Sequence, residues 1–139
     1  MLYDLIPNLP NDIIELIWSF VSPTCKIFTS KTNYLKYNYL IDDLIIDGRI
    51  ENYVRYMIIN ENRFVVKQII ERRFSHWLNM TNYPYQNQTF IDYVAFLKYY
   101  CYKNKLYISL FLINDKIELT GLKEKRSKNN ILKNNKWNK

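Results

Sequence analysis

Residues 9–21 constrain the fold most, because the sequence marks both ends of a short helix there. Pro10 has no amide proton and suits a first helical turn, and Asn11 or Asp12 can cap that turn with a side-chain oxygen. Apolar residues then recur with the helical period of about 3.6 residues: Ile13, Ile14, Ile17, Phe20 and Val21. Pro23 ends the helix, since the residue before a proline is pushed away from helical dihedral angles. The stretch therefore predicts a helix with one apolar face.

The same residues resemble the beginning of an F-box, a short helical module that attaches substrate adapters to the Skp1 arm of a cullin ubiquitin ligase. The resemblance extends from Leu9 to Leu40, and its matching positions are Leu9, Pro10, Asp12, Ile13, Ile14, Ile17, Phe20 and Pro23. Its second half departs from the F-box pattern, because the Val-Cys-x-x-Trp-like segment and its tryptophan are missing between Ile27 and Leu35.

The resemblance implies a protein–protein interaction module that docks a Skp1-like adapter protein. Its docking residues would be Leu9, Pro10, Ile13, Ile14, Ile17 and Phe20. The alternative is a helix that packs into the core of this chain and contacts no partner.

The whole layout is also similar to short F-box-like proteins of large DNA viruses of protists. Residues 22–34, 53–56 and 133–138 carry this similarity, which implies an F-box-like start, a helical remainder and a place in the host cytoplasm or nucleus. The abundance of Ile, Asn, Lys and Tyr, whose codons are AT-rich, fits such a source. For that reason the thirteen tyrosines do not by themselves indicate a binding surface.

The segment after Pro23 predicts one helical turn with Ile27 and Phe28 facing inward, then a new cap at Ser30 and a third helix from Tyr34 toward Ile46. Asp47-Gly48 predicts a break in the chain.

Apolar periods beyond this break predict four more helices. The first spans Ile50 to Ile58, the second spans Val65 to Leu78, the third is capped by Thr89, and the fourth begins at Leu106. Residues 79–88 predict a loop, and a strand is the alternative to a helix for residues 106–112. We therefore expect an all-α protein with an F-box-like segment (residues 1–46), two packed helical hairpins (residues 47–122) and a basic tail (residues 123–139).

The positive charge is concentrated in that tail. Residues 123–139 contain seven of the 20 basic side chains and one of the 13 acidic ones, so the first 122 residues carry 13 basic and 12 acidic groups. A basic arm attracts polyanions, which predicts weak nucleic-acid contact or a virion-associated role as the second function. The side chains concerned are Lys125, Arg126, Lys128, Lys133 and Lys136. The alternative is a tail that only reflects codon bias.

Residues for catalysis or cofactor binding are scarce. His76 is the only histidine, Gly48 and Gly121 stand alone, and Cys25 and Cys101 have no second metal ligand at a suitable spacing. No apolar run approaches the roughly 20 residues of a membrane span, and no secretory signal begins the sequence. We expect an intracellular protein that is not an enzyme and has no cofactor, metal, membrane or small-molecule substrate.

Overall fold

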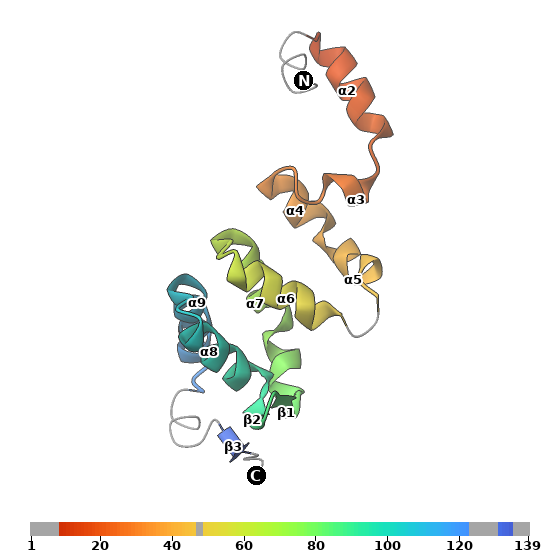
Figure 1. The fold of residues 1–139 in the computed structure, drawn as a ribbon. Helices are drawn as coiled ribbons and strands as arrows, with labels where there is room; N and C mark the ends of the chain where they lie inside the picture. Colours follow the sequence, from red (N-terminus) through yellow and green to blue (C-terminus); the bar gives the residue numbers. More distant parts are fainter. Residues whose placement is uncertain (1–8, 47–48, 123–130, 135–139) are drawn as a thin grey trace. The chain divides into compact units, whose positions relative to one another are not determined.

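The computed structural model describes residues 9–46, 49–122 and 131–134, and it divides into two compact units (Figure 1). The first unit is Met1–Ile50 and the second is Glu51–Lys139. The described chain is mostly helical, with a small antiparallel sheet in the second unit. The all-α prediction is therefore right for most of the chain and wrong for the sheet. The predicted break at Asp47-Gly48 lies outside the described residues.

Short helices make up the first unit. They are α2 (Asn11–Phe20), α3 (Pro23–Lys26), α4 (Lys31–Tyr37), the 3-10 helix η2 (Asn38–Leu40) and α5 (Ile41–Leu44). Pro23 opens α3 as predicted, and the Ser22 hydroxyl accepts a hydrogen bond from the Cys25 amide. Ser30 caps α4 as predicted by accepting from the Asn33 amide at 3.1 Å. The single third helix predicted from Tyr34 to Ile46 is wrong, because η2 interrupts it.

A small core holds this unit together. Ile27, Tyr34 and Ile41 are buried in it. Phe28, by contrast, is 58% exposed, so the prediction that it faces inward is wrong. Its ring only flanks the buried Tyr34 ring, at a centroid distance of 5.9 Å.

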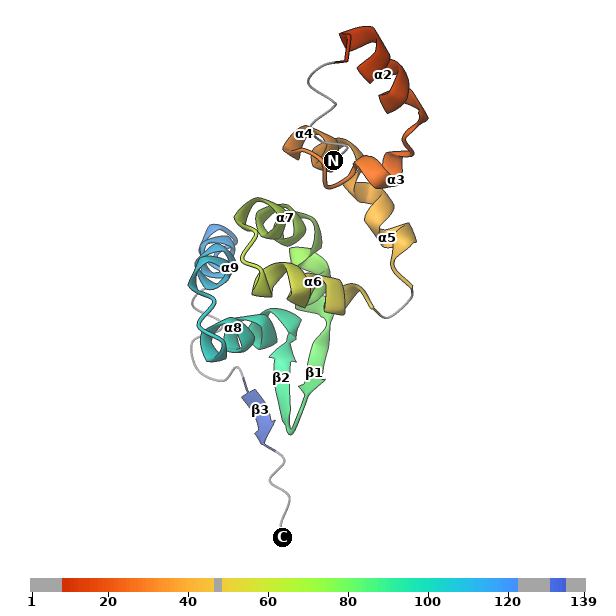
Figure 2. The same ribbon diagram turned by 45° about the horizontal axis from the view of Figure 1, so that its top comes forward.

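The helices of the second unit are longer. They are α6 (Ile50–Ile59), α7 (Arg63–Asn79), α8 (Tyr93–Lys103) and α9 (Tyr107–Leu119). Helix α9 packs against both α7 and α8, as Figure 2 shows from a second side. The Lys116 ammonium and the Glu71 carboxylate join α9 to α7, and the Ser109 hydroxyl donates to the Ile58 carbonyl of α6. The choice of helix over strand for residues 106–112 is confirmed by α9.

The first strand of the sheet lies where the sequence predicted the loop of residues 79–88. Strands β1 (Thr81–Tyr85), β2 (Gln88–Asp92) and β3 (Ile131–Asn134) are antiparallel in the order β1-β2-β3. Tyr83 pairs with Phe90 across β1 and β2. Their rings, together with that of Tyr85, pack on Phe96 of α8 at centroid distances of 4.6–5.7 Å. Tertiary packing of these aromatic rings explains why a Pro- and Asn-containing segment forms a strand.

The start of α8 also differs from the prediction. Thr89 lies inside β2 and does not cap the helix. The cap is the buried Asp92 carboxylate, which accepts a hydrogen bond from the Ala95 amide at 2.9 Å.

The basic tail is partly built into the sheet. Residues 131–134 form β3, whose Ile131 pairs with Phe90 and whose Lys133 pairs with Thr89. Part of the predicted basic tail therefore contributes a strand to the sheet. The other predicted polyanion-binding residues, Lys125, Arg126, Lys128 and Lys136, lie outside the described chain.

Candidate functional site on helix α2

Helix α2 is formed by local backbone contacts without a side-chain cap. The Ile13 and Ile14 amides donate to the Pro10 carbonyl at 3.0 and 3.1 Å. No side chain caps the helix, so the prediction of a cap at Asn11 or Asp12 is wrong. At the other end the Val21 amide donates to the Trp18 carbonyl, and Val21 itself has extended dihedral angles. Pro10 and Pro23 therefore delimit a helix of 10 residues.

The apolar surface of α2 is wider than a single face. At about 100° per residue, the apolar side chains cover an arc of about 200° in the angular order Leu16, Phe20, Ile13, Ile17, Val21, Ile14 and Trp18. The polar side chains occupy the remaining arc: Asn11, Glu15, Ser19 and Asp12. An ordinary surface helix needs an apolar stripe of roughly 100° to pack on a core, so α2 has about twice the necessary width.

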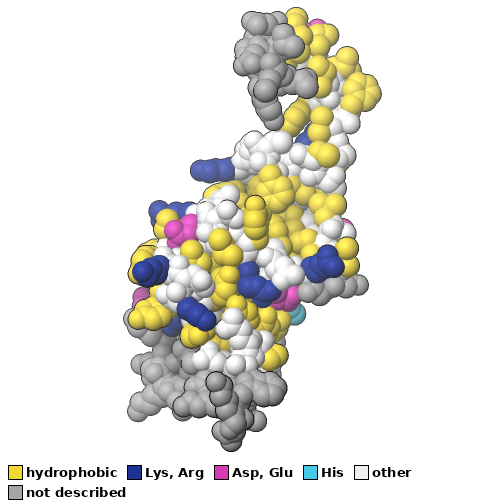
Figure 3. Space-filling view, viewed as in Figure 1, with side chains coloured by type: hydrophobic (Ala, Val, Ile, Leu, Met, Phe, Trp, Pro, Cys, Tyr) yellow, Lys and Arg dark blue, Asp and Glu magenta, His cyan; other side chains and the backbone are white. Residues whose placement is uncertain are grey.

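No side chain of α2 is fully buried in the described structure, and within the apolar arc only Ile14 and Val21 are partly buried. Ile17, at the centre of the arc, is 50% exposed, and Phe20 is 81% exposed. By comparison, Ile27 in the core of the same unit is 0% exposed. Figure 3 shows hydrophobic side chains along α2 at the top of the view. The helix thus presents to solvent the type of residue that proteins normally bury.

One flank of α2 is hollowed. A cavity of about 440 Å³ is lined by Leu9, Ile14, Glu15, Ile17, Trp18 and Val21. Its described walls are almost entirely apolar, and among the described lining residues Glu15 is the one with an ionisable side chain. A cavity of this size and character can hold apolar groups.

The predicted docking residues divide between the two flanks of this helix. Leu9, Ile14 and Ile17 lie together at the hollow. Ile13 and Phe20 lie on the opposite side of Ile17, and Pro10 is exposed at the start of the helix.

The sequence analysis did not name Glu15, Trp18 and Val21 as residues that line the hollow. It also did not include Leu16 in the apolar surface of the helix. Plotting every residue of the helix by angle, and not only the isoleucine stripe, would have found them.

Acidic side chains border the apolar surface. Asp12 and Glu15 are the ionisable groups of α2, and both are exposed. A cation also lies beside the helix, because the Lys26 ammonium is 5.5 Å from the centroid of the Trp18 ring. That contact joins the end of α2 to α3.

The described residues include no cluster of metal ligands. No group of three or more His, Cys, Asp or Glu side chains in the described ranges is placed to hold a metal ion. His76 is exposed on α7. Burial, with a smaller contribution from Glu61, raises the pKa of the Cys101 thiol to about 12, which leaves it un-ionised and poorly nucleophilic at neutral pH.

Tyr93 is another buried ionisable group. Burial raises the pKa of its phenol well above the usual range, and the nearby Arg55 guanidinium offsets part of that rise. Tyr93 packs against Trp77 and Tyr83 at centroid distances of 5.5 and 4.7 Å, as a core residue does.

No helix in the described part of the chain is both long enough and apolar enough to cross a bilayer. Comparison with protein-family models, with curated proteins and with solved structures gives no significant match to this chain.

Proposed function

We propose that this chain is an F-box-like adapter whose helix α2 docks a Skp1-type partner of a ubiquitin ligase. The observation that carries the proposal is that α2 has an apolar arc of about 200° and no buried side chain. A helix whose only role is to pack on the core of its own chain would bury the side chains at the centre of such an arc, whereas Ile17 at that centre is 50% exposed. Because the sequence of residues 9–23 resembles an F-box, the expected partner of this exposed surface is a Skp1-type protein.

Docking would use the two flanks of α2 differently. The hollow beside Leu9, Ile14 and Ile17 would receive apolar side chains of the adapter. Phe20, exposed on the other flank, would insert into the adapter as an aromatic anchor. Both contacts remove apolar surface from water at about 25 cal/mol per Å², which is the main source of affinity for a helix that binds in a groove.

The second unit would present a target protein. In this arrangement the first unit is the docking module, and the helices α6 to α9 supply a separate surface on a stable core. Such an adapter works in the host cytoplasm or nucleus and requires no catalytic group of its own.

The proposal is tested by measuring the binding of a purified Skp1-type protein to the full chain by calorimetry. The double substitution Ile14→Asp with Ile17→Asp places two carboxylates in the hollow and should abolish binding, because a charge buried without a partner is strongly unfavourable. Leu35→Asp is the matched control, since Leu35 is 55% exposed on α4 and lies off the proposed surface.

Binding that survives the double substitution, or that the control abolishes equally, contradicts the proposal. Circular dichroism of each variant shows whether the helices are retained. A double variant that has lost its helical signal would show that α2 belongs to the core.

A further inference from the structure

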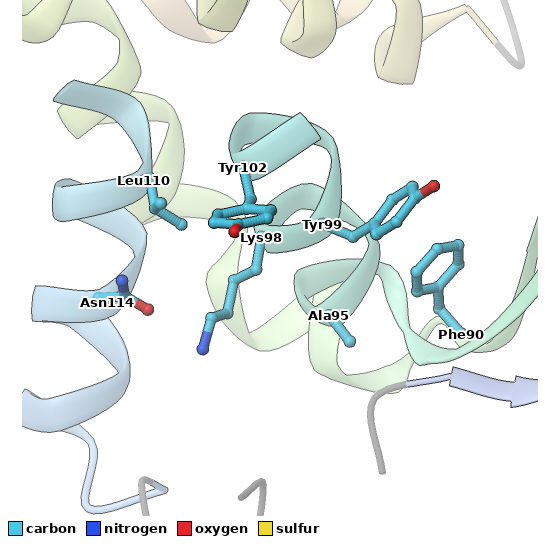
Figure 4. Close-up of a pocket in the computed structure, with 7 residues that line it drawn as sticks. All are labelled: Phe90, Ala95, Lys98, Tyr99, Tyr102, Leu110 and Asn114. Carbon is cyan, nitrogen blue, oxygen red and sulfur yellow. The ribbon is translucent and has the colours of Figure 1, made fainter. Parts of the chain in front are cut away.

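A second hollow, of about 360 Å³, lies in the second unit between α8 and α9, beside β2 (Figure 4). Three aromatic rings line it, those of Phe90, Tyr99 and Tyr102. The polar groups of its described lining are the Lys98 ammonium, the Asn114 amide and the phenol groups of Tyr99 and Tyr102. The described lining thus combines stacking surfaces with a cation and with groups that donate and accept hydrogen bonds.

Helical spacing brings these side chains together. Ala95, Lys98, Tyr99 and Tyr102 are spaced i, i+3, i+4 and i+7, so they share one face of α8. Leu110 and Asn114 are spaced i and i+4 on α9, and Figure 4 shows them facing Lys98 and Tyr102. Ala95, the only alanine of the sequence, also lines the hollow.

The two tyrosine rings differ in their surroundings. Tyr99 is held in place, because its ring packs on the buried Phe90 at a centroid distance of 5.1 Å and the Lys103 ammonium lies 5.7 Å from its centroid. Tyr102 is 73% exposed at the edge of the hollow. The Tyr102 ring therefore offers the accessible face on which a planar group can stack.

The charge of this region favours an anion. The chain from Tyr93 to Asn114 contains three lysines, Lys98, Lys103 and Lys105, and no acidic residue. The same stretch contains five of the thirteen tyrosines, of which Tyr102 and Tyr107 are exposed, Tyr99 lines the hollow and Tyr93 belongs to the core. Lysines interleaved with aromatic residues are typical of surfaces that bind single-stranded nucleic acid, in which bases stack on rings and cations follow the phosphates.

We propose that this hollow binds one nucleotide unit, with its base stacked on Tyr102, its phosphate attracted by Lys98 and its base edge hydrogen-bonded by Asn114. The volume is at the lower end of the roughly 300–1,000 Å³ of small-ligand sites, as one nucleotide requires. The ligand is either one nucleotide of a single-stranded nucleic acid or a free nucleotide, because both carry a base and a phosphate. The proposal does not depend on α2 or on its adapter.

The test measures fluorescence anisotropy of a labelled oligothymidylate, about a dozen nucleotides long, with the full chain. Tyr102→Ala should raise Kd about tenfold, because stacking on one base is worth roughly that factor. The exposed position and the high helix propensity of alanine keep α8 folded. Tyr56→Ala is the matched control, since Tyr56 is 62% exposed on α6 and should leave Kd unchanged.

Lys98→Gln tests the phosphate contact. The logarithm of the binding constant falls linearly with the logarithm of the salt concentration, and removing one contact should reduce that slope by about 0.7 for a single strand. Lys67→Gln, on the exposed surface of α7, is the control that should leave the slope unchanged.

Competition with uridine monophosphate distinguishes the two sources. If the mononucleotide displaces the oligonucleotide and its binding is weakened by Tyr102→Ala, the hollow is a free-nucleotide site. If only unlabelled oligonucleotides displace it, the hollow is a single-strand site. Either result supports the proposal. No binding, or a Kd that Tyr102→Ala and Tyr56→Ala leave equal, overturns it, because attraction through the basic tail would not depend on Tyr102.

Discussion

Placing a carboxylate at Ile17 tests whether the apolar arc of α2 is an interface or part of the core. Ile17 is half exposed, so Ile17→Asp gives up only about half of the 1.5–3 kcal/mol that complete burial of an isoleucine contributes. The lower helix propensity of aspartate adds a few tenths of a kcal/mol. We therefore expect the free energy of unfolding of the first unit to fall by about 1–2 kcal/mol, with the helix still formed.

Ile27→Asp is the matched control in the same unit. Ile27 is 0% exposed, so this substitution removes a complete core side chain and places a charge where water cannot reach it. Deleting a buried isoleucine alone costs about 2–5 kcal/mol, and the unpartnered carboxylate adds to that cost. We expect Ile27→Asp to unfold the first unit.

Urea unfolding followed by circular dichroism at the helical wavelength compares the two variants with the unchanged chain. The reasoning requires Ile17→Asp to stay close to the parent and Ile27→Asp to be severely destabilised. Equal destabilisation by both variants would refute it, because Ile17 would then be a core residue like Ile27.

Three further predictions follow from the second unit and the tail. Asp92→Ala should lower the stability by about 1–2 kcal/mol, measured by urea unfolding, because it removes the cap of the Ala95 amide, and Asp92→Asn should retain most of it. At pH 8 a thiol reagent should label the exposed Cys25 and leave Cys101 unlabelled until the protein is denatured. The reason is that Cys101 is buried and burial raises the pKa of its thiol to about 12. Equal labelling rates for the two cysteines would contradict this prediction. Deletion of residues 123–139 should weaken salt-sensitive attraction to nucleic acid, measured by anisotropy, and leave docking through residues 9–40 unchanged, since the deletion removes seven of the 20 basic side chains. Loss of docking on this deletion would show that the tail contributes to the adapter interface.

Local signals predicted the helices well. Helical periods located α2, α6 and α7, Pro23 located the start of α3, and the Ser-Lys-Thr-Asn segment located the cap at Ser30. These features depend on residues within a few positions of one another, so the sequence alone determines them.

Features that depend on distant contacts were missed. Tyr83 and Tyr85 alternate in β1, but Pro84 and the surrounding asparagines indicate a loop until the rings are seen to pack on Phe96 of α8. The pairing of Ile131 with Phe90 joins segments far apart in the sequence, so no local pattern predicts it.

The candidate site on α2 was predicted in part. The isoleucine stripe gave the correct helix with Ile14 and Ile17 at its hollow, and the F-box resemblance added Leu9, which also lines the hollow. Periodicity alone does not say whether an apolar stripe faces a core or solvent, because both produce the same pattern. The exposure of Ile17 and Phe20 in the folded chain supplies that information.

Hydrogen–deuterium exchange of the full chain, with and without a Skp1-type protein, tests the central claim most directly. If α2 is the docking helix, amides of residues 9–21 should exchange more slowly in the complex, while those of α8 and α9 keep their rates. Unchanged exchange in residues 9–21, or protection confined to the second unit, would contradict the account.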